Sequence, residues 1–280
     1  MNTISSAAVA GGQLLRMASR RSRMTKTVNI PSLFSTSTCQ SLFNPSEECT
    51  SLRDMVRTFV EREAEPQALY HNRSETFNHG LFRSLAPLGL LGLTVPVEYS
   101  GSGFSSAAAV TIVHEELSYS DPAFCLSYLA HSLLFCNNLA INGSHEQKLR
   151  FLPAACDGDA VCGMAMSEPG AGTDVLGMTT RAARRDDGTG CWVLKGSKMW
   201  ITNGTVDGSG DTGDLFLVYA RTGEGRGDLT QFVVEKGMKG FSLGQKIEDK
   251  LGMRASMTAE LVFDDVVIPE ENVVGEVNGA

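Results

Sequence analysis

The sequence predicts an α+β protein with two domains: an antiparallel helical bundle over residues 44–158 and a small antiparallel β-barrel or sandwich over residues 159–276. Three observations predict this fold class. Apolar residues recur with the helical period of about 3.6 before Gly158 and with the strand period of about 2 after it. The later apolar runs are short and alternate with turn-forming clusters such as DDGTG and GEGRGD, as in sandwiches and barrels. The composition also changes abruptly near residue 44, so a separate leader is expected before the helices.

The leader, residues 1–43, is rich in Arg, Ser and Thr and contains no acidic residue. This composition is typical of a mitochondrial transit peptide, which places the mature protein in the mitochondrial matrix. A merely disordered tail is the alternative. Cleavage is expected between residues 24 and 43, and N-terminal sequencing of the protein from cells tests it.

The expected helices begin at capping signals and then show apolar residues at the i, i+3, i+4 spacing. Ser46 caps the first helix, which ends near Pro66. Asp121 followed by Pro122 starts the fourth, and Ser144 with Gln147 forms a capping box for the fifth. The expected helices are residues 46–66, 77–90, 105–117, 121–143 and 144–156.

The expected strands are short apolar runs bounded by turn residues. They are residues 161–166, 178–184, 191–194, 199–202, 215–221, 231–234 and 259–263.

Composition excludes several classes of function. The net charge of −8 argues against nucleic-acid binding, which requires a basic face. The longest apolar candidate for a membrane span, residues 85–97, is too short and is broken by Pro87 and two glycines, so no span is expected. Seven cysteines without C-x-x-C spacing indicate reduced thiols in the core, and no metal site is expected.

The segment MAMSEPGAGTD, residues 164–174, has the composition of a ligand-binding turn. Gly170 and Gly172 let the backbone adopt positive φ and approach a bound group, and Ser167 and Thr173 add hydroxyl donors. A phosphate or the polar edge of a heterocycle suits such a turn. A strand running into a Pro-Gly turn without a ligand is the alternative.

A second segment, SKMWITNG, residues 197–204, reads as a strand that ends in an Asn-Gly turn. Trp200 and Thr202 are expected on the same side, where they combine a flat apolar wall with a hydrogen-bond donor. An isoalloxazine ring offers both a π face and polar ring nitrogens, so this pairing suits a flavin.

Two similarities to other motifs fail on context. The letters GSGDTG, residues 208–213, match G-x-G-x-x-G but precede an expected strand, whereas a dinucleotide site requires a helix there. His131 lies inside an apolar helix, where a satisfied buried histidine is expected rather than a base.

The two segments, in this order and at this separation, resemble the middle domain of the acyl-CoA dehydrogenase family, and residues 44–276 look like the first two of its three domains. Five further segments look most like the isovaleryl-CoA branch of that family: residues 71–78, 88–103, 114–124, 128–140 and 250–269. Gly170 departs from the Asn or Asp that this branch often has. The resemblance implies FAD as cofactor, an acyl-CoA thioester as substrate, an electron-transferring flavoprotein as acceptor, and a homotetramer for the full-length protein.

Carried onto matching positions, the resemblance implies two sets of site residues. Trp200, Ile201 and Thr202 lie near the reactive edge of the flavin, Arg226 contacts the CoA portion of the substrate, and Thr173, where the family has Ser, touches the thioester. The first segment contacts FAD through Met164, Met166, Ser167, Gly172 and Thr173.

The family's reaction removes the α proton of the thioester with a glutamate while hydride leaves the β carbon. That glutamate lies in, or just before, the family's third, helical domain, beyond Ala280, and Glu248, Glu260, Glu270 and Glu271 fall in no matching motif. We therefore expect residues 277–280 to be the truncated start of that domain, and the chain to be a fragment without its catalytic base. A short non-catalytic paralogue acting as a binding module, or part of an acyl-CoA oxidase or flavin monooxygenase, is the alternative.

Overall fold

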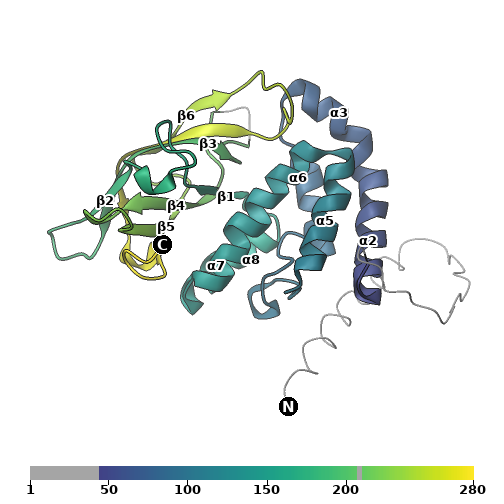
Figure 1. The fold of residues 1–280 in the computed structure, drawn as a ribbon, viewed down its shortest axis with the longest axis horizontal. Helices are drawn as coiled ribbons and strands as arrows, with labels where there is room; N and C mark the ends of the chain where they lie inside the picture. The colour runs from purple at the N-terminus through teal and green to yellow at the C-terminus, as the bar shows by residue number, and fades with distance from the viewer. Residues whose placement is uncertain (1–43, 207–209) are drawn as a thin grey trace, which may run out of the picture.

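The structure, a computed structural model, describes residues 44–206 and 210–280. Helices occupy the described chain up to Cys156, and the first strand begins at Cys162. In Figure 1 the helices lie on the right and the sheet on the left. The expected transit peptide and its cleavage site lie outside the described residues.

The helical part confirms three of the predicted start signals. The hydroxyl of Ser46 accepts a hydrogen bond from the N–H of Cys49 at 3.1 Å, and the carboxylate of Asp121 accepts one from Phe124 at 2.9 Å. Ser144 and Gln147 make both hydrogen bonds of the capping box. The helices are α2 (Glu47–Phe59), α3 (Glu65–Ser74), α4 (His79–Ser84), α5 (Ala107–Ser120), α6 (Pro122–Leu129), α7 (Asn138–Asn142) and α8 (His145–Cys156).

Two predicted helix boundaries are wrong. The first helix does not end near Pro66 but continues through a π-helical segment, Val60–Ala64, into α3. Proline lacks a backbone N–H and its ring clashes with the preceding turn, and the wider π turn just before it reduces both problems. The second predicted helix, residues 77–90, is broken into α4 and a 3₁₀ turn, Ala86–Leu88, that contains the next proline.

The helix predicted from Asp121 is continuous from α6 through a π-helical segment, Ala130–Asn137, into α7. Within the described residues this run, Pro122–Asn142, is the one helix long and apolar enough to cross a membrane, a candidate that the sequence analysis overlooked. More than half of its most apolar window (56%) is buried inside the protein, as in a core helix. His131 in its middle is buried, and its Nδ1 accepts from the N–H of Cys162 at 3.1 Å. Burial lowers the pKa of His131 to about 4, so the expected neutral core histidine is confirmed.

The strands form one mixed sheet in the order β6-β7-β3-β2-β4-β5-β8, with β1 paired to β4. β4 runs parallel to β1 and β2, and the other pairs are antiparallel. The two runs predicted at 191–194 and 199–202 are one strand, and β6 and β8 were not predicted. The bounds are β1 (Cys162–Ala165), β2 (Arg181–Arg184), β3 (Trp192–Thr202), β4 (Leu215–Arg221), β5 (Leu229–Glu235), β6 (Phe241–Ile247), β7 (Thr258–Ile268) and β8 (Val273–Val274).

One face of β4 packs against the helices. Leu215 and Leu217 join a core that contains Phe135 and Phe151 of the helical part. The alternate residues Phe216 and Val218 point into a separate core inside the β part. Strand periodicity therefore places β4 between two hydrophobic cores, which fixes the sheet relative to the helices.

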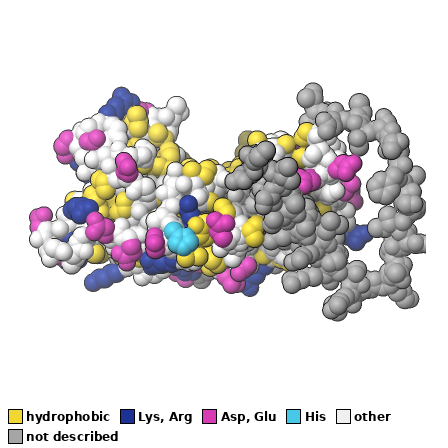
Figure 2. Space-filling view, turned by 90° about the horizontal axis from the view of Figure 1, so that it is seen from below, with side chains coloured by type: hydrophobic (Ala, Val, Ile, Leu, Met, Phe, Trp, Pro, Cys, Tyr) yellow, Lys and Arg dark blue, Asp and Glu magenta, His cyan; other side chains and the backbone are white. Residues whose placement is uncertain are grey.

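The described surface carries charges of both signs. On the face seen in Figure 2, Lys and Arg side chains are interspersed with Asp and Glu, without a continuous basic patch on the described part of that face. The six cysteines that the structure describes are free thiols, and five of them are buried, as predicted for small core residues.

Candidate functional site

The first predicted segment forms a loop that leaves the sheet and returns to it. β1 pairs with residues 215–218 of β4, and the chain rejoins β4 where Arg181 pairs with Arg221. Residues 166–180 lie between these two pairings and project from the sheet. The predicted site residues Ser167, Gly172 and Thr173 are all in this loop, so one local excursion of the chain positions them.

A buried carboxylate closes the base of this loop. Glu168 accepts hydrogen bonds from the N–H of Thr179 at 2.6 Å, from the Thr179 hydroxyl at 2.8 Å and from the N–H of Thr180 at 2.9 Å. Its fourth donor is the ammonium group of Lys198 in β3, at 2.9 Å. Lys198 also donates to the carbonyl of Met166 at 2.9 Å and faces the sulfur of Met178 at 3.5 Å. Every donor of the lysine and both oxygens of the carboxylate thus have partners.

The pair is charged although both side chains are buried. Burial alone raises the pKa of Glu168, but the hydrogen bonds from Thr180, Thr179 and Lys198 outweigh it and lower the pKa to about 2. Burial lowers the pKa of Lys198, and Glu168 opposes that shift. We assign the ionised pair, because the lysine has three acceptors and an ammonium group offers three donors.

The second predicted segment is the end of β3, where a β-bulge changes the register between Lys198 and Ile201. Trp200 lies in this bulge with a φ of 61°, a value that costs energy for a bulky residue. Its side chain is 53% exposed, whereas the side chain of Ile201 is buried in the core. A bulge re-aims side chains, and here it turns a large indole toward solvent. The predicted contribution of Ile201 is therefore limited to its backbone.

Hydrogen bonds join the two predicted segments. The N–H of Met199 donates to the carbonyl of Ser167 at 2.9 Å. At the end of β3, Asn203 forms the predicted turn, in which the N–H of Gly204 donates to Ile201 at 3.0 Å. The buried amide of Asn203 donates to Ser127 of α6 and to Cys162 of β1, both at 2.9 Å. The carbonyls of Met166 and Ser167 are thus engaged within the protein, whereas the half-buried Thr202 lies beside the turn.

The glycines of the loop contribute in a different way from the one predicted. Neither Gly170 nor Gly172 has a positive φ, so the stated reason for them is wrong. The turn is closed instead by two hydrogen bonds between Glu168 and Ala171. A Cβ atom at Gly170 or Gly172 would meet no other heavy atom within 4 Å. These positions therefore leave open space in which a bound group can approach the backbone, and this fits the phosphates or ring edge of FAD.

Arg226, predicted on the CoA side, lies next to the same loop. Its guanidinium group donates to Asp174 at 2.6 Å, and both side chains are exposed. Arg221 supports this arrangement by donating to the carbonyl of Leu176 at 2.6 Å and to that of Gly225 at 2.6 Å. The β4–β5 turn and the loop that carries Thr173 therefore lie side by side.

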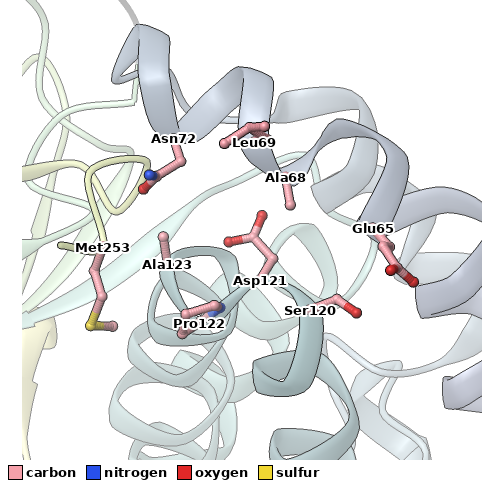
Figure 3. Close-up of a pocket in the computed structure, with 9 residues that line it drawn as sticks. All are labelled: Glu65, Ala68, Leu69, Asn72, Ser120, Asp121, Pro122, Ala123 and Met253. Carbon is pink, nitrogen blue, oxygen red and sulfur yellow. The ribbon is translucent and has the colours of Figure 1, made fainter.

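A cavity of about 340 Å³ lies between the helical part and the loop that leads into β7 (Figure 3). The carboxylate of Asp121 points into it, and burial raises the pKa of this group. Met253 lines the opposite side, five residues before Thr258, which pairs with Thr202 of the second segment. Sequence reasoning assigned Asp121 only its capping role. The other residues that line the cavity are Glu65, Ala68, Leu69, Asn72, Ser120, Pro122 and Ala123.

Metal chemistry has no visible site in the described part of the chain. No three His, Cys, Asp or Glu side chains of residues 44–206 and 210–280 gather in a way that could hold a metal ion.

Comparison with known families gives two matches. The model of the acyl-CoA dehydrogenase N-terminal domain matches residues 46–159, and that of the acyl-CoA dehydrogenase middle domain matches residues 163–266. The chain belongs to the acyl-CoA dehydrogenase family. The family resemblance drawn from the two segments is thereby confirmed, and both segments lie in the matched middle domain.

The chain is also similar to individual members of the acyl-CoA dehydrogenase family. It is 41% identical over 240 residues to the mitochondrial isovaleryl-CoA dehydrogenase of Pongo abelii, covering 83% of this chain and 54% of that protein. It also resembles an acyl-CoA dehydrogenase from Bacillus anthracis solved in complex with FAD, with a TM-score of 0.74, 31% identity and coverage of 83% and 39%. A chain in the structure of the electron transferring flavoprotein of Acidaminococcus fermentans matches with a TM-score of 0.77, 31% identity and coverage of 85% and 60%. The chain spans about half the length of the curated relatives it matches.

Sequence reasoning missed the Glu168–Lys198 pair, although both residues lie inside the two segments that it singled out. The sequence did offer one signal for this pair, because Lys198 is a charged residue at a strand position that otherwise faces inward. In the run from Lys198 to Ile201 both end residues are buried, and only the bulge between them makes this compatible with strand geometry.

Proposed function

We propose that this chain forms the helical and flavin-binding parts of an FAD-dependent acyl-CoA dehydrogenase that acts on a short branched acyl-CoA, with isovaleryl-CoA as the first substrate to test. The hydrogen bond between Met199 and Ser167 carries the proposal, because it places the two predicted flavin segments against each other. The similarity to isovaleryl-CoA dehydrogenase supports the substrate, and the relative solved with FAD supports the cofactor.

The residues of this chain bind and orient the reactants. The exposed indole of Trp200 offers a flat wall for the isoalloxazine ring, and the hydroxyl of Thr202 offers a donor at its edge. The open backbone at Gly172 and the hydroxyls of Ser167 and Thr173 would hold the polar part of the cofactor. When bound, FAD supplies the acceptor for the hydride that leaves the β carbon of the thioester.

Substrate binding is assigned to Thr173 and Arg226. The two residues lie on adjoining loops, since Arg226 is ion-paired with the neighbour of Thr173. A guanidinium group recognises phosphate with two parallel hydrogen bonds, which suits the phosphate groups of CoA. Thr173 is exposed in that loop.

The catalytic base is not assigned to a residue of this chain. A base for the weakly acidic α proton needs a raised pKa and access to the substrate. Glu168 has the opposite properties, because it is buried, paired with Lys198 and has its pKa lowered to about 2. Glu248 and Glu270 form exposed ion pairs with Lys246 and Arg184.

We further propose that the complete protein is a homotetramer in the mitochondrial matrix that passes electrons to an electron-transferring flavoprotein. The mitochondrial relative and the composition of residues 1–43 support the location. The match to a chain in an electron-transferring flavoprotein structure supports the partner.

The test is to purify the 280-residue chain and measure bound flavin by its visible absorbance and turnover by dye reduction with isovaleryl-CoA. We expect weak FAD binding without steady turnover. Absence of any FAD binding contradicts the flavin assignment, and steady turnover contradicts the need for a base from elsewhere. Peroxide formation by the complete protein points to an oxidase instead.

A further inference from the structure

The two flavin segments follow β1 and lie at the end of β3, two strands of the same sheet that do not pair with each other. β1 pairs with β4, whereas β3 pairs with β2 and β7. Pairing through β4 and β2 places β1 and β3 in one sheet, but no strand pair joins the first segment, after β1, directly to the second, at the end of β3. Direct contact between the two segments comes from side chains and from the Met199–Ser167 backbone hydrogen bond.

One of these contacts is the buried ion pair of Glu168 and Lys198. Glu168 follows Ser167 directly, and Lys198 precedes Trp200 by two residues. The side chain of Lys198 is fully buried and that of Glu168 is 3% exposed. The lysine also binds the carbonyl of Met166, so it contacts the first segment on both sides of Ser167.

A buried ion pair is a poor way to gain stability. Removing two charges from water costs several kcal/mol per ion, so apolar residues of similar volume often stabilise a protein as well or better. In some proteins buried ionic groups are retained because they select one geometry among several. Here the selected geometry is that of the loop base, because three hydrogen bonds from Thr179 and Thr180 also converge on Glu168.

The loop base and β3 are closely packed at this point. The hydroxyl of Thr180 donates to the carbonyl of Ser197 at 3.2 Å. Gly196 has a φ of 143°, and a Cβ atom there would lie 2.6 Å from the Thr180 hydroxyl. β3 therefore lies close against the returning end of the loop at Gly196, two residues before Lys198.

We propose that Glu168 and Lys198 are positioning residues that hold the Ser167–Thr173 turn and the Trp200–Thr202 strand in the one relative placement in which both contact the same flavin. The inference rests on the proposed FAD site. Neither side chain touches the cofactor, since both are buried behind the segments that do.

Four variants of the 280-residue chain test this proposal: Glu168→Gln, Lys198→Met, the double variant, and Lys195→Met as control. Lys195 lies on the same strand, but its ion pair with Asp265, at 3.5 Å, is exposed on both sides. The dissociation constant of FAD, the visible spectrum of the bound flavin and the denaturation midpoint are measured for each. The spectrum reports where the ring lies, which a purely structural role of the pair does not change.

We expect both single variants to lose stability, because each leaves a buried charge without its partner. The double variant carries no buried charge and is expected to recover the denaturation midpoint. Its FAD affinity should nevertheless stay lower than that of the unmodified chain by roughly tenfold or more, by analogy with the loss seen when outer-shell partners of metal ligands are removed. The spectrum of its bound flavin should also remain altered, while Lys195→Met matches the unmodified chain.

Recovery of FAD affinity and spectrum together with stability in the double variant overturns the positioning role and leaves the FAD assignment intact. Failure of the unmodified chain to bind FAD is a different result, which overturns the proposed function and this inference with it. A loss of affinity as large in Lys195→Met also overturns the inference, because any charge on the strand would then have the same effect.

Discussion

Replacing Asn203 tests how the helices and the sheet are held together. Its buried amide donates to carbonyl oxygens of Ser127 and Cys162, and its φ is 62°. In Asn203→Ala both buried carbonyls lose a donor, which costs about 2–4 kcal/mol in total. Alanine at positive φ adds about 1 kcal/mol more, whereas glycine adopts this conformation freely. We therefore expect Asn203→Gly to be destabilised by about 2–4 kcal/mol and Asn203→Ala by about 3–5 kcal/mol.

Urea unfolding followed by circular dichroism measures both free energies of unfolding. The order of the two variants separates the backbone contribution from the hydrogen bonds. If both variants lie within about 1 kcal/mol of the unmodified chain, the two hydrogen bonds do not hold the parts together. If Asn203→Ala is as stable as Asn203→Gly, the positive φ at this position does not destabilise alanine relative to glycine.

Three further predictions concern the loop and the strand beside it. The folded-state pKa of Glu168, about 2, lies below its ordinary 4.5. The ionised carboxylate therefore adds up to about 3 kcal/mol to the free energy of unfolding above pH 4.5, and this contribution is lost as the pH falls toward 2. The difference between acid titrations of the unmodified chain and of Glu168→Gln should show this loss. Trp200→Gly removes the indole and relieves a positive φ, so FAD binding should weaken while the denaturation midpoint stays unchanged or rises. Gly172→Ala should leave stability within about 0.5 kcal/mol, since its Cβ meets open space, but should weaken FAD binding measured by flavin fluorescence; equal affinity would show that nothing approaches this backbone.

Local signals predicted the helix starts well. Ser46, Asp121 and Ser144 each cap a helix through a hydrogen bond that reaches three residues along the chain, so nothing distant is needed to find it. The end of the first helix failed because propensity rules stop a helix near proline, and a π turn that depends on packing allows Pro66 here. β6 and β8 failed because their stability comes from partners in β7 and β5 rather than from their own patterns.

The residues of the candidate site could be predicted from the sequence, but the side-chain contacts that hold its two segments in place could not. The two segments carry irregular residues at fixed spacing, and the structure joins them through Ser167 and Met199. The glycine argument failed because an open backbone and a positive φ are different reasons for glycine, and sequence alone does not separate them. The pairing of Glu168 with Lys198 spans 30 residues, so no local pattern shows it.

The excursion of residues 166–180 has a consequence for how this protein can diverge. β1 and β2 follow one another along the same neighbour, β4, and the excursion begins and ends there. No strand pair fixes its length, so residues added at its tip leave every strand pairing of the sheet unchanged. Selection can lengthen, shorten or recompose this segment, and so adjust what it holds, while the scaffold beneath keeps its geometry. A change at the two ends of the excursion has no such freedom.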